Sequence, residues 1–119
     1  RHSAMNEQRL RYLHDHGLYD LPDSERPNCH RNKKHSYKSV YGRMKWEGIA
    51  PTITGGFGSI GQGRFGHPSR LRSITPHEAA RLQGFPDGFA FHGGVVAGRT
   101  QTGNAVPVPL AASVVGELL

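Results

Sequence analysis

The sequence is poor in cysteine, in acidic residues and in long apolar runs, and each shortage excludes a class of protein. Cys29 is the single cysteine, so no disulfide framework can form within the chain, and we expect a reducing, cytoplasmic location. No apolar run approaches the roughly 20 residues that cross a bilayer, so we expect no membrane partner. The 9 acidic residues against 15 lysines and arginines leave a net charge of +6, which favours nucleic acid as a partner.

Glycine and proline are abundant instead. The 16 glycines and 8 prolines among 119 residues predict long loops, and an apolar content of 35% allows one small domain with a modest core. Because the chain begins at Arg1 and stops on two leucines, we expect it to be a piece of a larger protein, either excised or a separate subunit.

Two segments in the first half and centre of the chain carry helix signals. Residues 3–17 have an N-cap at Ser3 and a terminating glycine, although their apolar stripe is thin. Residues 74–85 carry a stronger signal, because Thr75 followed three residues later by Glu78 forms a capping box around a proline at the first helical position. Gly84 then ends this predicted helix.

The end of the chain, from about Val108, predicts a third helix. Leu110, Val114 and Leu118 fall on one face, and few polar residues cover the others. A helix this apolar favours burial on more than one side. We therefore expect it either to pack on a missing part of the protein or to cause the isolated chain to self-associate.

The centre of the chain predicts strands. Residues 39–54 contain β-branched and aromatic residues in short runs around a turn near Glu47 and Gly48, and a weak strand signal follows at Arg64 and Phe65. The predicted fold class is therefore α+β, with a small, irregular, mostly antiparallel sheet, two or three short helices and long glycine-rich loops.

The glycine-rich stretch 55–66 contains the spacing G-x-G-x-x-G, which is found in dinucleotide-binding folds. That interpretation needs a helix directly after the third glycine, but two more glycines and Pro68 follow instead. Glycines also let a backbone approach a ligand closely, and Arg64 and His67 add positive charge. The stretch is thus either a DNA-contacting loop or a surface loop without a partner.

Three segments in this order resemble the DNA cytosine-5 methyltransferases. "SITPHEAARLQGFPDGF" is similar to their ninth conserved motif, and "QTGNAVPVPLAASVVGELL" to their tenth. "GRMKWEGIAPTITGGF" and the following "GRFGHP" resemble the end of their target recognition domain, where a threonine and an aliphatic residue recur; here these are Thr52 and Ile53. The resemblance covers about Tyr41 to Leu119.

Other family features are absent from this sequence. Neither the Pro-Cys-Gln motif of the nucleophile nor the Glu-Asn-Val motif occurs, and the glycine motif that opens the S-adenosylmethionine fold is missing. Cys29 lies between Asn28 and His30 and does not match the nucleophile. The resemblance therefore implies the C-terminal part of such an enzyme, as in restriction-modification, which is inactive alone and binds no S-adenosylmethionine by itself.

The residues expected to bind double-stranded DNA come from two sources. The resemblance implies that Thr52 contacts the DNA backbone near the flipped base and that the following glycines face the major groove. Basic composition adds lysines of the polar connection 18–38, which is either a phosphate-contacting strip or a solvated loop. The full predicted set is Thr52, Thr54, Gly55, Gly56, Arg64, Lys33, Lys34 and Arg43. We expect Thr52→Ala and Arg64→Ala to weaken DNA binding.

The resemblance also implies two further groups of residues and a division of the chain. Arg72, Arg81 and Gln83 belong to the ninth motif, which organises the recognition domain, although Arg81 is equally explained as a helix-surface residue. Asn104, Ala105 and Val106 belong to the tenth motif, which completes the S-adenosylmethionine pocket. Residues 1–103 would then be the recognition domain, and residues 104–119 the helix that packs on the missing catalytic domain or subunit.

Three other interpretations remain open, and one of them is a pure interaction domain that docks through the last helix. A stand-alone basic nucleic-acid-binding module, without a methyltransferase partner, would share the charge and the loops but leave the apolar last helix unexplained. A metal site would have to use His14, His16, Cys29, His30 and His35, whose spacing matches no tetrahedral zinc signature. We expect no metal ligands.

Overall fold

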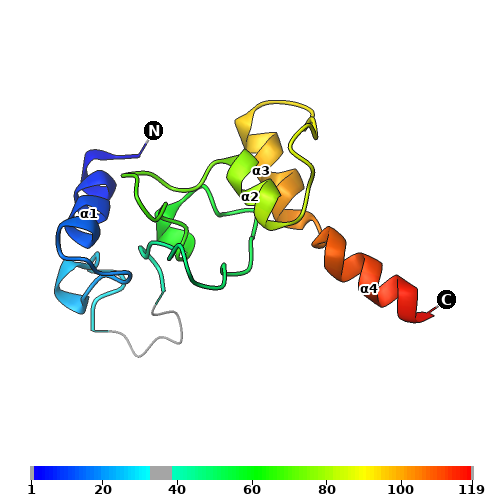
Figure 1. The fold of residues 1–119 in the computed structure, drawn as a ribbon. Helices are drawn as coiled ribbons and strands as arrows, with labels where there is room; N and C mark the ends of the chain where they lie inside the picture. Colours follow the sequence, from blue (N-terminus) through cyan, green and yellow to red (C-terminus); the bar gives the residue numbers. More distant parts are fainter. Residues whose placement is uncertain (1, 33–38, 119) are drawn as a thin grey trace. The chain divides into compact units, whose positions relative to one another are not determined.

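The computed structural model describes residues 2–32 and 39–118, which belong to two compact units. The first unit comprises Arg1–Pro51 and Ser59–Ile74, and the second comprises Thr52–Gly58 and Thr75–Leu119. The chain therefore leaves the first unit for one short segment, returns to it, and then completes the second unit. Figure 1 follows this path from the blue N-terminus to the red C-terminus.

The described part of the first unit contains one α-helix and two short 3-10 helices. The helix α1 (Ala4–Asp15) is capped by the Ser3 hydroxyl, which accepts from the Asn6 N–H, and buries Leu10 and Leu13. Gly17 follows with a φ of 63°, so the prediction of a glycine-terminated helix here is confirmed. The 3-10 helices are η1 (Asp23–Glu25) and η2 (Ile60–Gln62). The buried apolar residues of this unit are Leu10, Leu13, Leu21, Val40, Met44, Ile60, Phe65 and Ile74.

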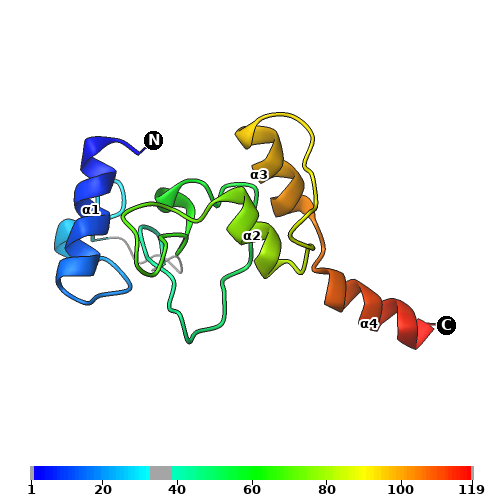
Figure 2. The same cartoon turned by 45° about the horizontal axis from the view of Figure 1, so that its top comes forward.

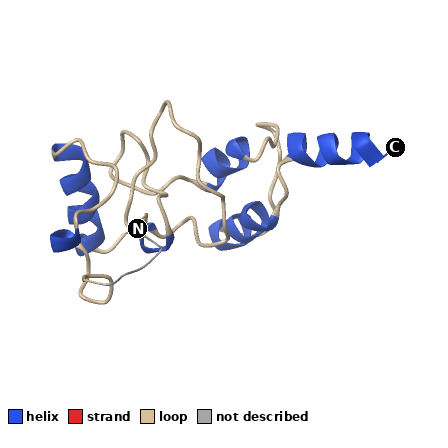
Figure 3. Cartoon of the chain, turned by 90° about the horizontal axis from the view of Figure 1, so that it is seen from below, coloured by secondary structure: helices blue, strands red, loops and turns tan. Residues whose placement is uncertain are grey.

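The predicted sheet is wrong. Among the described residues no strand forms, and Figure 3 shows helices joined by loops. The segments expected to be strands make only single bridges, a parallel one from Arg43 to Gly66 and an antiparallel one from Gly66 to Ser73. The α+β class is therefore replaced by helices and irregular loops.

The backbone of the predicted first strand explains the error. Tyr41 has a φ of 61°, which an extended strand cannot accommodate. Its N–H donates to the Ile60 carbonyl, and the N–H of Arg43, two residues later, donates to the Tyr19 carbonyl. The backbone here therefore bonds to different segments rather than to one neighbouring strand. A Cβ on Gly66 would lie 2.9 Å from the Gly42 carbonyl oxygen, so the two segments cross closely at one point. Tertiary contacts override the local β-propensity.

The second unit contains three helices. The helix α2 (Pro76–Leu82) begins with the predicted capping box: the Thr75 hydroxyl accepts from the Glu78 N–H at 3.2 Å, and the Glu78 carboxylate accepts from the Thr75 N–H at 2.8 Å. The helix α3 (Val95–Asn104) was not predicted, and it lies beside α2 in Figures 1 and 2. Between them Phe85, Phe89 and Phe91 form an aromatic cluster.

The last helix, α4 (Val108–Leu118), matches the predicted C-terminal helix. Its first turn is attached to the end of α2, because the Val108 N–H donates to the Gln83 carbonyl at 3.0 Å. Gly84, with a φ of 79°, leaves room there for Pro109. Beyond this turn, Leu110, Val114, Val115 and Leu118 are all at least 51% exposed. Of residues 2–32 and 39–118, none belongs to a helix whose length and hydropathy suit a bilayer-spanning segment.

Candidate nucleic-acid interface

The segment Thr52–Gly58 lies directly against α3 within the second unit. A Cβ on Gly103 of α3 would lie 2.3 Å from the Gly55 nitrogen and 2.5 Å from the Thr54 carbonyl carbon. Real side chains do not tolerate such distances, so glycine at position 103 permits direct backbone-to-backbone packing. The helix thus serves as the support on which this segment is held.

Burial alternates along the segment. Ile53 is 7% exposed and Phe57 is fully buried, whereas Thr52, Thr54 and Gly55 are exposed. The Phe57 N–H closes a turn by donating to the Thr54 carbonyl at 3.1 Å. Two apolar anchors therefore fix the segment and present its hydroxyl groups to solvent, as a surface that binds an external ligand requires.

The support itself is fixed by Gln83. This residue is 6% exposed, and its side-chain amide donates to the carbonyls of Thr102 at 3.2 Å and Ala105 at 3.1 Å. Thr102 is fully buried, and its hydroxyl donates to the Gly98 carbonyl one turn earlier. The end of α2 is thereby tied to the end of α3, which supports an organising role for Gln83.

The two predicted DNA-binding arginines that the structure describes lie in the first unit, where both make internal contacts. Arg64 donates two hydrogen bonds to the Asp20 carboxylate, at 2.6 and 3.0 Å, and each side chain is 37% exposed. Arg43 donates to the carbonyls of Leu18 and Pro68, and its guanidinium carbon lies 4.4 Å from the centre of the Tyr19 ring. Thr52, Thr54, Gly55 and Gly56 thus belong to one unit and these arginines to the other. Lys33 and Lys34 lie outside the described residues.

The other two organising candidates occupy different settings. Arg72 contacts the Ser73 carbonyl at 3.0 Å in the first unit. Arg81 on α2 forms a two-bond ion pair with Asp87, and both side chains are about 60% exposed. Hydrogen bonding from Arg81 lowers the pKa of Asp87 below its usual value, and the same bond raises the pKa of Arg81. This pair holds the loop after α2.

Asn104, Ala105 and Val106 form the turn between α3 and α4. Asn104 is the last residue of α3, and Ala105 is extended, with a φ of −74° and a ψ of 143°. The side chains of Asn104 and Val106 are exposed. An exposed turn of this kind encloses no pocket by itself.

The comparison with protein families now decides the family. The model of the C-5 cytosine-specific DNA methylases matches residues 2–119. The chain belongs to this family.

Curated relatives agree. Over 112 residues the methylase-family chain is 59% identical to the Type II methyltransferase M1.BsuMI of Bacillus subtilis (strain 168), covering 92% of this chain and 26% of that protein. It is 43% identical over 112 residues to the Type II methylase M.HgiDII of Herpetosiphon aurantiacus, covering 89% and 32%. It is 39% identical over 84 residues to mouse DNA (cytosine-5)-methyltransferase 1, covering 70% and 5%. The chain spans about a quarter to a third of the two bacterial relatives.

The histidines and the cysteine that the structure describes form no group of three that could hold a metal ion. Cys29 is exposed. His14 has a buried Nε2 without a hydrogen-bond partner in the described residues, and burial, followed by the charge of Arg43, lowers its pKa. His35 lies outside the described residues.

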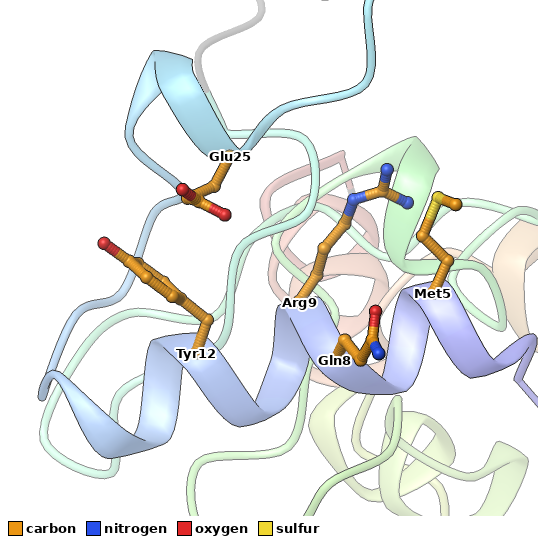
Figure 4. A pocket seen from close by; sticks show the side chains of 5 residues that line it. All are labelled: Met5, Gln8, Arg9, Tyr12 and Glu25. Atoms are coloured by element: carbon orange, nitrogen blue, oxygen red, sulfur yellow. The ribbon is translucent and has the colours of Figure 1, made fainter.

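A cavity on the first unit was not predicted. Its volume is about 260 Å³, and Met5, Gln8, Arg9, Tyr12 and Glu25 line it. Figure 4 shows four of these side chains on α1 and Glu25 on η1. The Arg9 guanidinium carbon also lies 5.1 Å from the centre of the Tyr41 ring, so the cation is part of the packing of this unit.

The residues of α3 that support the segment were also missed from sequence. Gly103 and Thr102 were not singled out because the helix itself was not predicted. A glycine in a segment with no apolar period carries little signal until its partner, the Thr54–Gly55 backbone, is known.

Proposed function

We propose that this chain is the target-recognition and C-terminal part of a DNA cytosine-5 methyltransferase of the restriction-modification type. The whole protein would transfer a methyl group from S-adenosylmethionine to C5 of a cytosine flipped out of duplex DNA. Its catalytic cysteine would come from a part of the protein outside this sequence, because no Pro-Cys-Gln motif is present. The chain alone would therefore bind DNA without methylating it.

The observation that carries this proposal is the segment Thr52–Gly58 held on α3. Membership of the family supports the proposed reaction class, and the exposed residues Thr52 and Thr54 on the α3 support are the groups proposed to contact DNA. A hydroxyl donates well to a phosphate oxygen, and such contacts position a protein on the duplex before bases are read. The net charge of +6 adds a sequence-independent attraction.

The remaining groups complete the proposed division of labour. Gln83 would hold the α2–α3 support, the Arg81–Asp87 pair would hold the loop after α2, and Arg72 would organise the first unit. Asn104, Ala105 and Val106 would form one edge of the pocket for S-adenosylmethionine, which supplies the methyl group when bound. Residues 104–119, including the exposed face of α4, would pack on the catalytic part. The division of the chain into residues 1–103 and 104–119 is based on this proposed packing, and it remains a prediction.

The test uses the whole enzyme that contains this chain, with labelled S-adenosylmethionine and a panel of duplexes. We expect methyl transfer to cytosine in a preferred sequence, and none from the 119-residue chain alone. Thr52→Ala should lower duplex affinity by roughly 10- to 100-fold, since a hydrogen bond to a charged group contributes about 1.5–3 kcal/mol. Thr100→Ala is the matched control, because that exposed hydroxyl donates to Val96 of its own helix.

Two results would contradict the proposal. Absence of methyl transfer by the whole protein, with duplex binding intact, would favour a nucleic-acid-binding module instead. Equal affinities for Thr52→Ala, Thr100→Ala and the unmodified enzyme would remove Thr52 from the DNA interface.

A further inference from the structure

Arg99 on α3 lies against the far end of the supported segment. A Cβ on Gly58 would lie 2.3 Å from both Cζ and Nε of Arg99, and 2.6 Å from its Nη1. The guanidinium thus occupies the space that a side chain at position 58 would fill. Arg99 and Gly103 are four residues apart on α3, so they share one face of the helix, about 6 Å apart along its axis. One helix face therefore contacts the segment at two places, Thr54–Gly55 and Gly58.

The charge of Arg99 is not balanced within the described residues. Its Nε is buried without a hydrogen-bond partner, and no described carboxylate forms an ion pair with it. The second unit contains three acidic residues. Glu78 is bound in the capping box, Asp87 is paired with Arg81, and Glu117 lies in the last turn of α4.

A buried guanidinium nitrogen without an acceptor is costly. Arg99 as a whole is only half-buried, so its unbalanced charge is open to an external acceptor. The groups around Arg99 indicate which kind of acceptor would bind there. Arg99 on α3 and the exposed residues Thr52 and Thr54 on the segment that α3 supports all carry hydrogen-bond donors. A phosphate offers several acceptor oxygens to such a set, and arginine binds phosphate through two parallel bonds. A single carboxylate from elsewhere in the protein would satisfy the guanidinium alone.

We propose that Arg99 contacts the phosphate backbone of the DNA that the segment Thr52–Gly58 binds. The contact rests on the function proposed above and adds a cation that sequence patterns did not identify. This contact requires glycine at position 58, because a Cβ there would displace the guanidinium from its place beside the segment. The contact is independent of DNA sequence, since a phosphate carries no base information.

The test is duplex binding by the whole enzyme across a salt series, with Arg99→Gln and Gly58→Ala. Loss of one phosphate contact should reduce the slope of log affinity against log salt by about 0.9, and lower affinity equally for preferred and random duplexes. Gly58→Ala should have the same effect, because the flexible arginine would be displaced while the backbone stays in place. Its φ is not in the left-handed region, so alanine is tolerated there.

Two substitutions serve as controls. Arg11→Gln removes an exposed cation of the first unit, and Gly88→Ala adds a methyl group where no atom lies within 4 Å. Both should leave the salt slope unchanged. Thermal melting of each variant shows whether it is folded, and Gly58→Ala carries the test if Arg99→Gln does not fold.

The outcomes separate this proposal from the function on which it rests. If the unmodified enzyme neither binds nor methylates duplex DNA, the proposed function fails. If it does both, but the folded Arg99 and Gly58 variants keep the full salt slope, the phosphate contact is overturned. A loss of affinity without a change of slope also overturns it, because Arg99 would then act on the segment or on a carboxylate elsewhere in the protein.

Discussion

Arg99 of the second unit is engaged differently from the two first-unit arginines that were predicted to bind DNA. In the first unit, Arg64 is bound to Asp20, and Arg43 is bound to two carbonyls and packed on Tyr19. In the second unit, Arg99 has no ion pair among the described carboxylates. Thr52 and Thr54 are exposed on the segment that packs against α3. A basic sequence therefore does not identify its ligand contacts, because some of its cations are needed to stabilise the fold.

The largest effect should come from Gly103→Ala, which inserts a methyl group between α3 and the segment. Because backbone atoms of Thr54 and Gly55 would have to move, we expect a loss of about 1–3 kcal/mol in the free energy of unfolding, together with weaker DNA binding. Denaturant unfolding of the whole enzyme measures it. Gly88→Ala should unfold like the unmodified protein, and equal stability of the two variants would contradict the close packing.

Gln83→Leu should follow in size. It leaves the carbonyls of Thr102 and Ala105, the first of which is buried, without the side-chain amide, at a cost of about 1–3 kcal/mol. Gln101→Leu is the matched control, since this exposed glutamine donates to the His92 carbonyl and should change stability by less than about 0.5 kcal/mol. If both substitutions cost the same, Gln83 does not organise the α2–α3 support.

The Arg64–Asp20 pair tests the other side of the comparison. Since both side chains are partly exposed, we expect its removal to cost up to about 1 kcal/mol. A double-mutant cycle with Arg64→Gln and Asp20→Asn should show coupling in stability. If Arg64 binds DNA as the glycine-rich stretch predicts, its variant will also lose affinity that Asp20→Asn retains. Additive stability effects would show that the ion pair contributes nothing to the first unit.

The smallest effect should appear with pH. Burial and Arg43 lower the pKa of His14 in the folded state, so the unfolded chain binds its proton more readily. Stability should therefore fall as the pH drops below the ordinary value of 6.5 towards the lowered folded value. Denaturation midpoints between pH 7.5 and 5 measure this, and His14→Gln should flatten the dependence. The same dependence in that variant would assign it to another group.

Features encoded within a few residues were predictable from sequence. The Thr75–Glu78 capping box gave the start of α2, and the spacing of Leu110, Val114 and Leu118 gave α4. Features that depend on distant partners were not. The helix α3 has no apolar period and contains Gly98 and Gly103, so it is stabilised by contacts with α2 and the segment. The prediction of strands was wrong because the backbone turns at Tyr41 and the residues beside it form hydrogen bonds with separate segments.

The candidate site shows the same division. Thr52 and Thr54 belonged to the DNA-binding set predicted from sequence. The distinction between Arg99 and the arginines that make internal contacts needed the positions of Asp20, Tyr19 and Gly58. No sequence spacing encodes these contacts, since Asp20 and Arg64 are 44 residues apart.

The most direct test of the central claim is amide hydrogen exchange of the whole enzyme with and without its preferred duplex. The account predicts slower exchange across Thr52–Gly58 in the complex, with smaller changes at the Arg99 turn of α3. Unchanged exchange across this segment, while the enzyme is saturated with DNA, would contradict the claim that α3 presents it to the DNA backbone.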